Sequence, residues 1–297
     1  MKPLRVALVH RAGENTRTRT YGPWSYPVPE FEVEHFEAHK GFEFKRSEFA
    51  GMFDLIFYED GKLYGTFWTD ADIPLVYNVT DSTLSEELYQ IRLGQAKQAD
   101  LITVDWDKLE RFDGLGKPVR RLSYCVNDTL CKDYGLEKTV DVGMYMTFDA
   151  ERRELLEQVK EFCKSKGYSL AASSKLRGEG YAKAFNQTKV CLNFSRTPET
   201  RNHRVLDVMA SRSCLLTTPL PYVTGEDLRP GRSFEVFTDG IDGLEKAIES
   251  LLSTGDWGRI ADAGYEMIHK YHTWAVRALW LRTLLLHEFP QLRKAVA

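Results

Sequence analysis

The stretch TPETRNHRVLDVMASRSCLLTT, residues 197–218, gathers arginines and carboxylates around the start of one short predicted helix. The strand before it, KVCLNFS, would bring Asn193, Ser195 and Arg196 to its carboxyl end, and the helix is expected to begin near Asn202. A helix N-terminus carries free N–H groups and a partial positive charge. This position therefore suits a phosphate or a diphosphate.

The predicted helix has two unlike faces. Its apolar arc consists of Val205, Leu206, Val208 and Met209. On the other side Asp207 is expected to point away from the core, one turn beyond Arg204, where it could accept hydrogen bonds from sugar hydroxyls; Arg201 adds positive charge. The alternative is that Arg204 and Asp207 form a solvated surface ion pair with no ligand.

Short apolar runs and helical segments alternate along the chain and must position these residues. Strands are predicted at residues 4–10, 31–38, 53–59, 73–79, 100–106, 139–147, 168–173, 188–195 and 214–218, and helices at 82–99, 150–167, 178–187 and three segments after 240. This alternation predicts two α/β domains with largely parallel sheets. Ligands bind such sheets at the carboxyl ends of strands, and the cleft between two domains is the expected site. Lys175 also follows a strand and is a further candidate.

The loop HRAGENTRTRTYGPWSYPVPE, at residues 10–29, mixes arginines with aromatic rings. The candidate residues in it are Arg11, Arg17, Arg19, Tyr21 and Trp24. Such a loop could bind a nucleotide diphosphate, a sugar acceptor or unstacked DNA bases. The alternative is a surface loop with ordinary solvated arginines.

The composition excludes several classes of function. A net charge of −3 argues against general attraction to nucleic acid or an anionic membrane. Five cysteines without a CxxC pair favour reduced thiols and a cytoplasmic protein, and no apolar run is long enough to span a bilayer. His269 and His272 lack acidic or thiol partners nearby in the sequence, so they are interpreted as structural, and no metal site is expected.

The segments LNFSRTPETRNHRVLDVMASRSCLLTT and RIADAGYEMIHKYHTWAVRALWLRTLL resemble the C-terminal domain of GT-B glycosyltransferases, and most of all the CgeB-like group with its glycosyl transferases group 1 domain. The resemblance covers roughly residues 139–285. It implies Glu199 near the donor sugar, Asp207 near the ribose, and Arg196, Arg201 or Arg204 near the diphosphate. Asp207 replaces a glutamate of the group, and Arg212 and Ser213 stand where a glycine is usual.

The resemblance also implies an activity: transfer of a sugar from a nucleotide-sugar to a hydroxyl acceptor, without a bound metal or other cofactor. An inverting transfer needs a general base, for which His10, Asp60 and Asp81 are candidates, with Asp81 and His10 ranked level. Asp81 could instead cap a helix, and His10 could be a satisfied core imidazole. The acceptor is a glycan, a lipid-linked or a small molecule; the alternatives are a hydroxylated DNA base and a non-catalytic nucleotide-binding module.

The implied architecture is GT-B-like, with two Rossmann-like domains facing a cleft and helices at the C-terminus. Residues 1–137 would form the acceptor-side domain and residues 138–297 the nucleotide-sugar-binding domain, with the last helix packing back on the first domain.

Overall fold

The computed structural model divides the chain into two compact units. The residues it describes are 2–11, 23–59, 65–79, 86–104, 109–195, 202–220 and 228–297. The first unit holds residues 1–17, 26–124 and 275–297, and the second holds residues 18–25 and 125–274. The longer segment of the second unit begins at Cys125, and Val126 ties it to the segment's end by donating to His272 O at 2.9 Å and accepting from Trp274 N at 3.0 Å.

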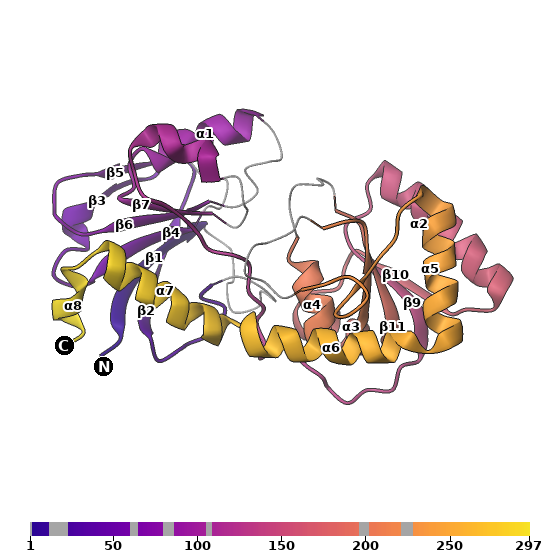
Figure 1. The fold of residues 1–297 in the computed structure, drawn as a ribbon. Helices are drawn as coiled ribbons and strands as arrows, with labels where there is room; N and C mark the ends of the chain where they lie inside the picture. The colour runs from indigo at the N-terminus through magenta and orange to yellow at the C-terminus, as the bar shows by residue number, and fades with distance from the viewer. Residues whose placement is uncertain are drawn as a thin grey trace. The chain divides into compact units, whose positions relative to one another are not determined.

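The first unit is built on a six-stranded parallel sheet in the order β2-β1-β4-β6-β7-β8 (Figure 1). Its strands are β1 (Leu4–Arg11), β2 (Phe31–Ala38), β4 (Leu55–Glu59), β6 (Leu75–Val79), β7 (Leu101–Val104) and β8 (Val119–Arg121). A small parallel pair, β3 (Glu43–Lys45) and β5 (Thr66–Trp68), and two 3₁₀ segments, Arg46–Glu48 and Leu109–Leu115, complete it with helix α1 (Glu86–Ala96).

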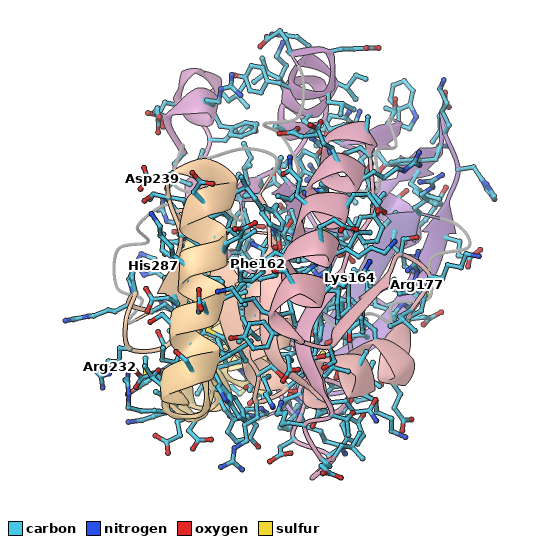
Figure 2. The ribbon with its side chains drawn as sticks, turned by 90° about the vertical axis from the view of Figure 1, so that its right-hand side faces the viewer. Phe162, Lys164, Arg177, Arg232, Asp239 and His287 are labelled. Carbon is cyan, nitrogen blue, oxygen red and sulfur yellow. The ribbon has the colours of Figure 1, made fainter. Side chains whose placement is uncertain are left out.

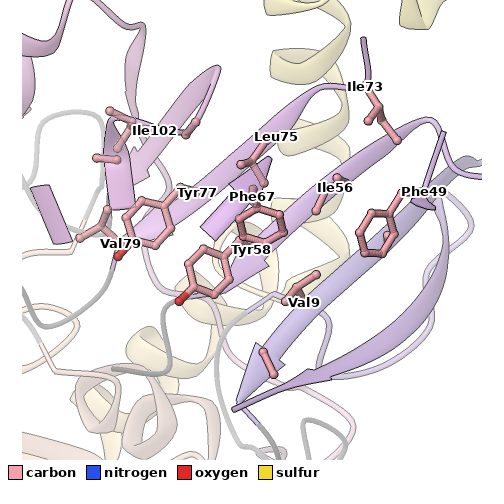
Figure 3. Close-up of a cluster of buried hydrophobic side chains, with 14 of the residues drawn as sticks. Val9, Phe49, Ile56, Tyr58, Phe67, Ile73, Leu75, Tyr77, Val79 and Ile102 are labelled. Atoms are coloured by element: carbon pink, nitrogen blue, oxygen red, sulfur yellow. The ribbon is translucent and has the colours of Figure 1, made fainter. Parts of the chain in front are cut away.

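One face of this sheet carries an aromatic core (Figure 3). Tyr58 and Tyr77, on neighbouring strands, stack with their ring centroids 5.1 Å apart, and Phe67 packs against Tyr58. Helix α7 (Trp274–Glu288) lies on the other side of the sheet from α1 (Figure 1). It is joined to the unit by Arg282, which donates to Lys2 O at 2.8 Å, and by an ion pair between Arg120 and Glu288 at 2.7 Å. A short helix, α8 (Leu292–Ala295), follows.

The second unit contains a five-stranded parallel sheet in the order β10-β9-β11-β12-β13. Its strands are β9 (Val140–Tyr145), β10 (Leu170–Ser173), β11 (Thr188–Asn193), β12 (Cys214–Thr217) and β13 (Glu235–Val236). Its helices are α2 (Ala150–Lys166), α3 (Gly178–Asn186), α4 (Arg204–Ala210), α5 (Gly240–Thr254) and α6 (Asp256–Tyr271). The predicted α/β class with parallel sheets is confirmed.

Helix α2 shows how local sequence sets these elements. Asp149 caps its start by accepting from Arg152 N at 3.0 Å, and Gly167 ends it in the left-handed region with φ 71°. Phe162 lies on its buried face and Lys164 on its exposed face (Figure 2). Among the helices in the described ranges, none is both long enough and apolar enough to cross a membrane.

In both sheets the order in which strands are added reverses beside the first strand, β1 in one sheet and β9 in the other. In the second unit the chain moves from β9 to β10 on one side and then from β10 back to β11 on the other side of β9. In such sheets a ligand binds beyond the carboxyl ends of the strands where the order reverses. The β9/β11 boundary is therefore the place to look for a site in this unit.

Candidate functional site

Arg204, the first residue of α4, bridges the ends of β9 and β11. Its Nε donates to Tyr145 O at 2.9 Å and its Nη1 donates to Asn193 Oδ1 at 2.8 Å. Tyr145 and Asn193 are the last residues of their strands. One guanidinium thus fixes the two strand ends at the reversal point of the sheet.

Asn193 extends this connection to β12 and to the start of α4. Its side chain is fully buried, donates through Nδ2 to Thr217 Oγ1 at 2.9 Å, and accepts from Asn202 Nδ2 at 3.0 Å. The predicted donor residues Asn193, Asn202 and Arg204 are therefore brought together, with Thr217 added from the next strand. Asn202 and Arg204 are half-buried, so this network reaches the surface of the unit.

The expectation that Asp207 points away from the core is wrong. Asp207 is 0% exposed, and its Oδ2 lies 2.8 Å from His203 Nδ1. Every residue of α4 from Val205 to Ala210 is buried, because α6 and α3 also pack against this helix. Arg204 instead donates hydrogen bonds to Tyr145 O and Asn193 Oδ1 at the strand ends, so the surface-pair alternative does not describe it.

The start of α4 also differs from the predicted phosphate cradle. The helix has only seven residues, and its early N–H groups have backbone partners: Val205 N donates to Asn202 O at 3.2 Å, while Leu206 N and Asp207 N donate to His203 O at 3.0 and 3.1 Å. These three groups are not available to an anion. Positive charge at this point comes from the Arg204 side chain.

The remaining donor-side candidates lie around the same sheet edge or outside the described residues. Ser195 N donates to Thr218 Oγ1 at 3.2 Å, just beyond β11, and Lys175 is exposed beyond β10. Arg196, Glu199 and Arg201 fall outside the described ranges.

Arg152, which sequence reasoning did not single out, also ties strand ends together. It is nine-tenths buried, and its Nη2 donates to Phe194 O at 2.6 Å while its Nη1 donates to Thr147 O at 3.2 Å. It therefore links the segment after β9 to the end of β11. In the sequence it is one of four charged residues in a row near the start of a helix, a pattern that gives no sign of burial.

Two tyrosines beside Arg204 stay neutral at ordinary pH. Burial raises the pKa of Tyr145 to about 12, and its hydroxyl lies 3.0 Å from Thr188 Oγ1. Burial also raises the pKa of Tyr181, with the nearby Asp207 adding to the effect. These phenols therefore do not act as acids or bases at ordinary pH.

In the first unit, His10 lies at the carboxyl end of β1, as predicted. It is 3% exposed, with Nδ1 3.1 Å from Arg11 O and Nε2 3.3 Å from His35 Nδ1. Both ring nitrogens are engaged, which is the arrangement of a satisfied core imidazole. Glu59, at the end of the neighbouring β4, is a buried carboxylate.

The basic aromatic loop is only partly described. Arg17, Arg19 and Tyr21 lie outside the described residues, as do the candidate bases Asp60 and Asp81, and Arg11 is exposed at the end of β1. The prediction that Trp24 offers an exposed aromatic face to a ligand is wrong. The Trp24 side chain is 4% exposed and packs edge-on against Trp274, with ring centroids 5.1 Å apart.

No group of three metal-ligating side chains occurs within the described ranges. His269 has a structural contact, with Nε2 3.1 Å from Ala210 O at the end of α4 and its ring 4.2 Å from that of Tyr265.

Comparison with known proteins finds a family model that matches most of the second unit and part of α7. Residues 151–283 match the model of a family described as glycosyl transferase-like. A search of curated proteins found no match.

Solved structures share the fold at low sequence identity. A sucrose-phosphate synthase from Thermosynechococcus elongatus is 12% identical with a TM-score of 0.63, over 97% of this chain and 100% of that chain. Anabaena HepE, in complex with UDP and glucose, is 10% identical with a TM-score of 0.61, over 96% of this chain and 100% of that chain. The pneumococcal O-GlcNAc transferase GtfA, in complex with UDP and GlcNAc, is 13% identical with a TM-score of 0.52, over 77% of this chain and 56% of that chain.

The resemblance drawn from the sequence is confirmed by these matches: residues 151–283 match a glycosyl transferase-like family, and the chain has the α/β fold of the GT-B glycosyltransferases.

Proposed function

We propose that this protein transfers a sugar from a nucleotide-sugar donor to a hydroxyl acceptor. The observation that carries the proposal is the bridge made by Arg204 between Tyr145 O and Asn193 Oδ1, because it places a cation at the strand reversal point of the glycosyl transferase-like domain. A guanidinium has five N–H donors in a planar fork, so Arg204 has further donors beyond these two bonds.

The donor would lie beyond β9 and β11, with its diphosphate toward Arg204. Arg196, Arg201 and Lys175 remain predicted to add positive charge, and Glu199 remains predicted to contact the sugar. Several basic side chains can stabilise a leaving diphosphate without a metal, so we propose metal-independent transfer. Uridine nucleotides are the first donors to test, because HepE and GtfA are described in complex with UDP.

For the acceptor we propose a glycan, a lipid-linked molecule or a small molecule rather than DNA. The burial of Trp24 removes one of the rings that could have stacked on an unpaired base, and the net charge of −3 opposes a polyanion. Asp81 stays the first candidate for a general base on the acceptor side, and His10 could act as one only by giving up a present partner of its ring nitrogens.

The first test is thermal unfolding in the presence of UDP, ADP, GDP and CDP and of their glucose conjugates, with and without EDTA. A ligand at about 100 times its dissociation constant stabilises a fold by ~2.7 kcal/mol. We expect one nucleotide series to raise the melting temperature, and EDTA to leave that rise unchanged. A folded protein that responds to none of these compounds contradicts the proposal.

A positive thermal shift then identifies the donor for an activity assay. Release of the nucleoside diphosphate from the conjugate, with and without candidate acceptors, separates a transferase from a module that only binds nucleotides. Release that requires an acceptor would establish transfer, whereas tight binding without any turnover would favour the binding module.

A further inference from the structure

Helix α7 exposes large apolar side chains on the surface of the first unit (Figure 1). Val276 is 40% exposed, Leu279 57% and Trp280 40%, and they make up three of the six exposed large apolar side chains in the described part of the chain. At 100° per residue these positions and Thr283 lie on one side of the helix. These four residues are called the outer face of α7 below.

The other side of α7 is already buried in the first unit. Ala278, Leu281 and Leu285 are 0% exposed, and Arg282 donates to Lys2 O at 2.8 Å. These contacts hold the helix in place without the outer face. The apolar side chains of the outer face therefore have no part in the core of the unit.

The outer face also lacks the charges that a helix surface in contact with water normally carries. Helix α2 follows the usual pattern, with Arg153, Glu157, Lys160 and Lys164 among its exposed residues. The exposed residues of α7 are Ala275, Val276, Leu279, Trp280, Thr283 and His287, and none of them is a lysine, an arginine or an acid. A face of this composition is typical of a surface that binds apolar material.

Positive charge gathers at the C-terminal end of this helix. Helices α7 and α8 together contain four lysine and arginine residues and one acid, Glu288, in a chain whose net charge is −3. Glu288 is paired with Arg120 at 2.7 Å. Arg293 and Lys294 are exposed on α8, and Arg293 Nε donates to Leu286 O of α7 at 3.0 Å. The outer face thus has a basic border at its C-terminal end.

We propose that the outer face of α7 docks the first unit on an anionic lipid bilayer. Tryptophan and leucine side chains enter the interfacial region of a bilayer, and neighbouring lysines and arginines are attracted to acidic headgroups. The basic border favours this occupant over a second copy of the chain, whose α7 and α8 carry charge of the same sign. The overall net charge argues only against a general attraction to such a surface.

The geometry sets the mode of docking. Because the inner side of α7 is buried in the unit, only the outer face can enter the headgroup region, with the helix lying along the bilayer. Docking of this kind is reversible, and its electrostatic part weakens as salt is added.

Sedimentation of the whole protein with vesicles is the first test. One vesicle preparation is phosphatidylcholine alone, and the other mixes phosphatidylcholine with phosphatidylglycerol. We expect the protein to sediment with the mixed vesicles, less with phosphatidylcholine alone, and less with the mixed vesicles when salt is raised.

Two tryptophan substitutions make a matched pair, because each removes one exposed ring from the first unit. Trp280 lies on the outer face, whereas Trp68, which is 52% exposed, lies on β5. We expect Trp280→Ser to weaken binding to the mixed vesicles about 10-fold, and Trp68→Ser to leave it unchanged. Melting temperatures measured without vesicles check that each variant is folded.

The basic border is tested by a second matched pair. Arg293→Gln combined with Lys294→Gln should weaken binding to the mixed vesicles by about 10-fold or more, since each cation near an anionic surface contributes roughly 5-fold. Lys45→Gln combined with Lys97→Gln removes two exposed lysines elsewhere in the same unit and should change nothing.

Several results would overturn the proposal. One is wild-type protein that does not sediment with the mixed vesicles, and another is equal weakening by Trp280→Ser and Trp68→Ser. A dimer in solution that Trp280→Ser dissociates, without vesicle binding, would assign the outer face to a second copy instead. All these measurements are made without nucleotide, so their failure leaves the proposed function untouched, and failure of donor binding leaves this proposal untouched.

Discussion

At the scale of single residues, Arg204 is the side chain on which the geometry of the strand ends depends. We predict that Arg204→Lys weakens donor binding about 10-fold and lowers the free energy of unfolding by ~1–2 kcal/mol. A lysine keeps the charge but has no planar fork to span Tyr145 O and Asn193 Oδ1. Calorimetry with the donor and urea unfolding would measure the two effects.

The exposed Arg153 on α2 offers a matched control for this substitution. Arg153→Lys should change neither donor affinity nor stability by more than a few tenths of a kcal/mol, about the usual range for surface positions. If Arg204→Lys behaves like Arg153→Lys, the bridge between the strand ends has no energetic importance.

Lys138 makes a pH-dependent contribution to the stability of the second unit. It lies at the amino ends of the strands, opposite the candidate site. Its Nζ donates to Arg212 O at 2.7 Å, Ser213 Oγ at 2.8 Å and Thr188 O at 3.0 Å. Burial lowers its pKa from 10.5 to about 8. Below pH 8 the lysine is protonated in both the folded and the unfolded protein, and folding bears the full cost of burying the charge.

Between pH 8 and 10.5 the unfolded chain binds the proton and the folded chain does not, so this group stabilises the fold increasingly as pH rises. We predict that the free energy of unfolding of wild-type protein, relative to Lys138→Met, rises between pH 8 and 9.5 by up to ~1.4 kcal/mol per pH unit. Urea unfolding at several pH values measures the difference, in which contributions common to both proteins cancel. A constant difference would contradict the lowered pKa.

At the scale of elements, the close packing of α6 depends on one glycine. A Cβ at Gly264 would lie 2.6 Å from Ser233 O and 3.1 Å from Met209 Cγ, so an alanine cannot fit unless backbone shifts. We predict that Gly264→Ala destabilises the second unit by ~1–3 kcal/mol and lowers donor affinity, because Met209 belongs to α4.

Gly258, in the same helix, is the matched control. A Cβ there would meet nothing within 4 Å. Gly258→Ala should stabilise the protein by ~0.5–1 kcal/mol through helix propensity alone. Thermal unfolding of the two variants should therefore shift in opposite directions, and equal shifts would contradict the packing argument.

The regular elements were largely predictable from the sequence, because their signals are local. The run LRVALVH became β1, and the helix predicted to close at Gly167 became α2 with that glycine as its cap. Strands of two or three residues, such as β13 and the β3–β5 pair, were not predicted, since so few residues show no periodicity.

The candidate site was predictable only as a neighbourhood. The strand ends and the start of α4 could be placed from the sequence, and Asn193, Asn202 and Arg204 do meet there. The burial of Asp207 could not be predicted, because a helical wheel describes the faces of α4 but not that Tyr181 of α3 and Cys131 come close to the polar one. The same limitation explains Trp24, whose partner Trp274 is distant in the sequence.

At the scale of the whole molecule, all five cysteines are buried and none forms a disulfide. Burial raises the pKa of Cys163 to about 11 and that of Cys191 to about 12, and it raises the pKa of Cys131 and Cys214 well above the usual range. We predict that native protein reacts with a thiol reagent at pH 8 only as fast as it opens, and that denatured protein reacts at all five positions. One thiol that reacts within seconds in native protein would contradict this.

The division of the chain into units has a consequence for its synthesis. The first unit is completed by residues 275–297, where Ala275 N donates to Tyr26 Oη at 3.0 Å and Arg282 reaches Lys2 O. The ribosome makes β1 before residues 125–274 of the second unit, whereas it makes α7 only after them. Domains usually fold in the order of their synthesis. The second unit can therefore form its core first. Until α7 has been made, one apolar face of the six-stranded sheet stays uncovered, and chaperones bind exposed apolar surface of this kind.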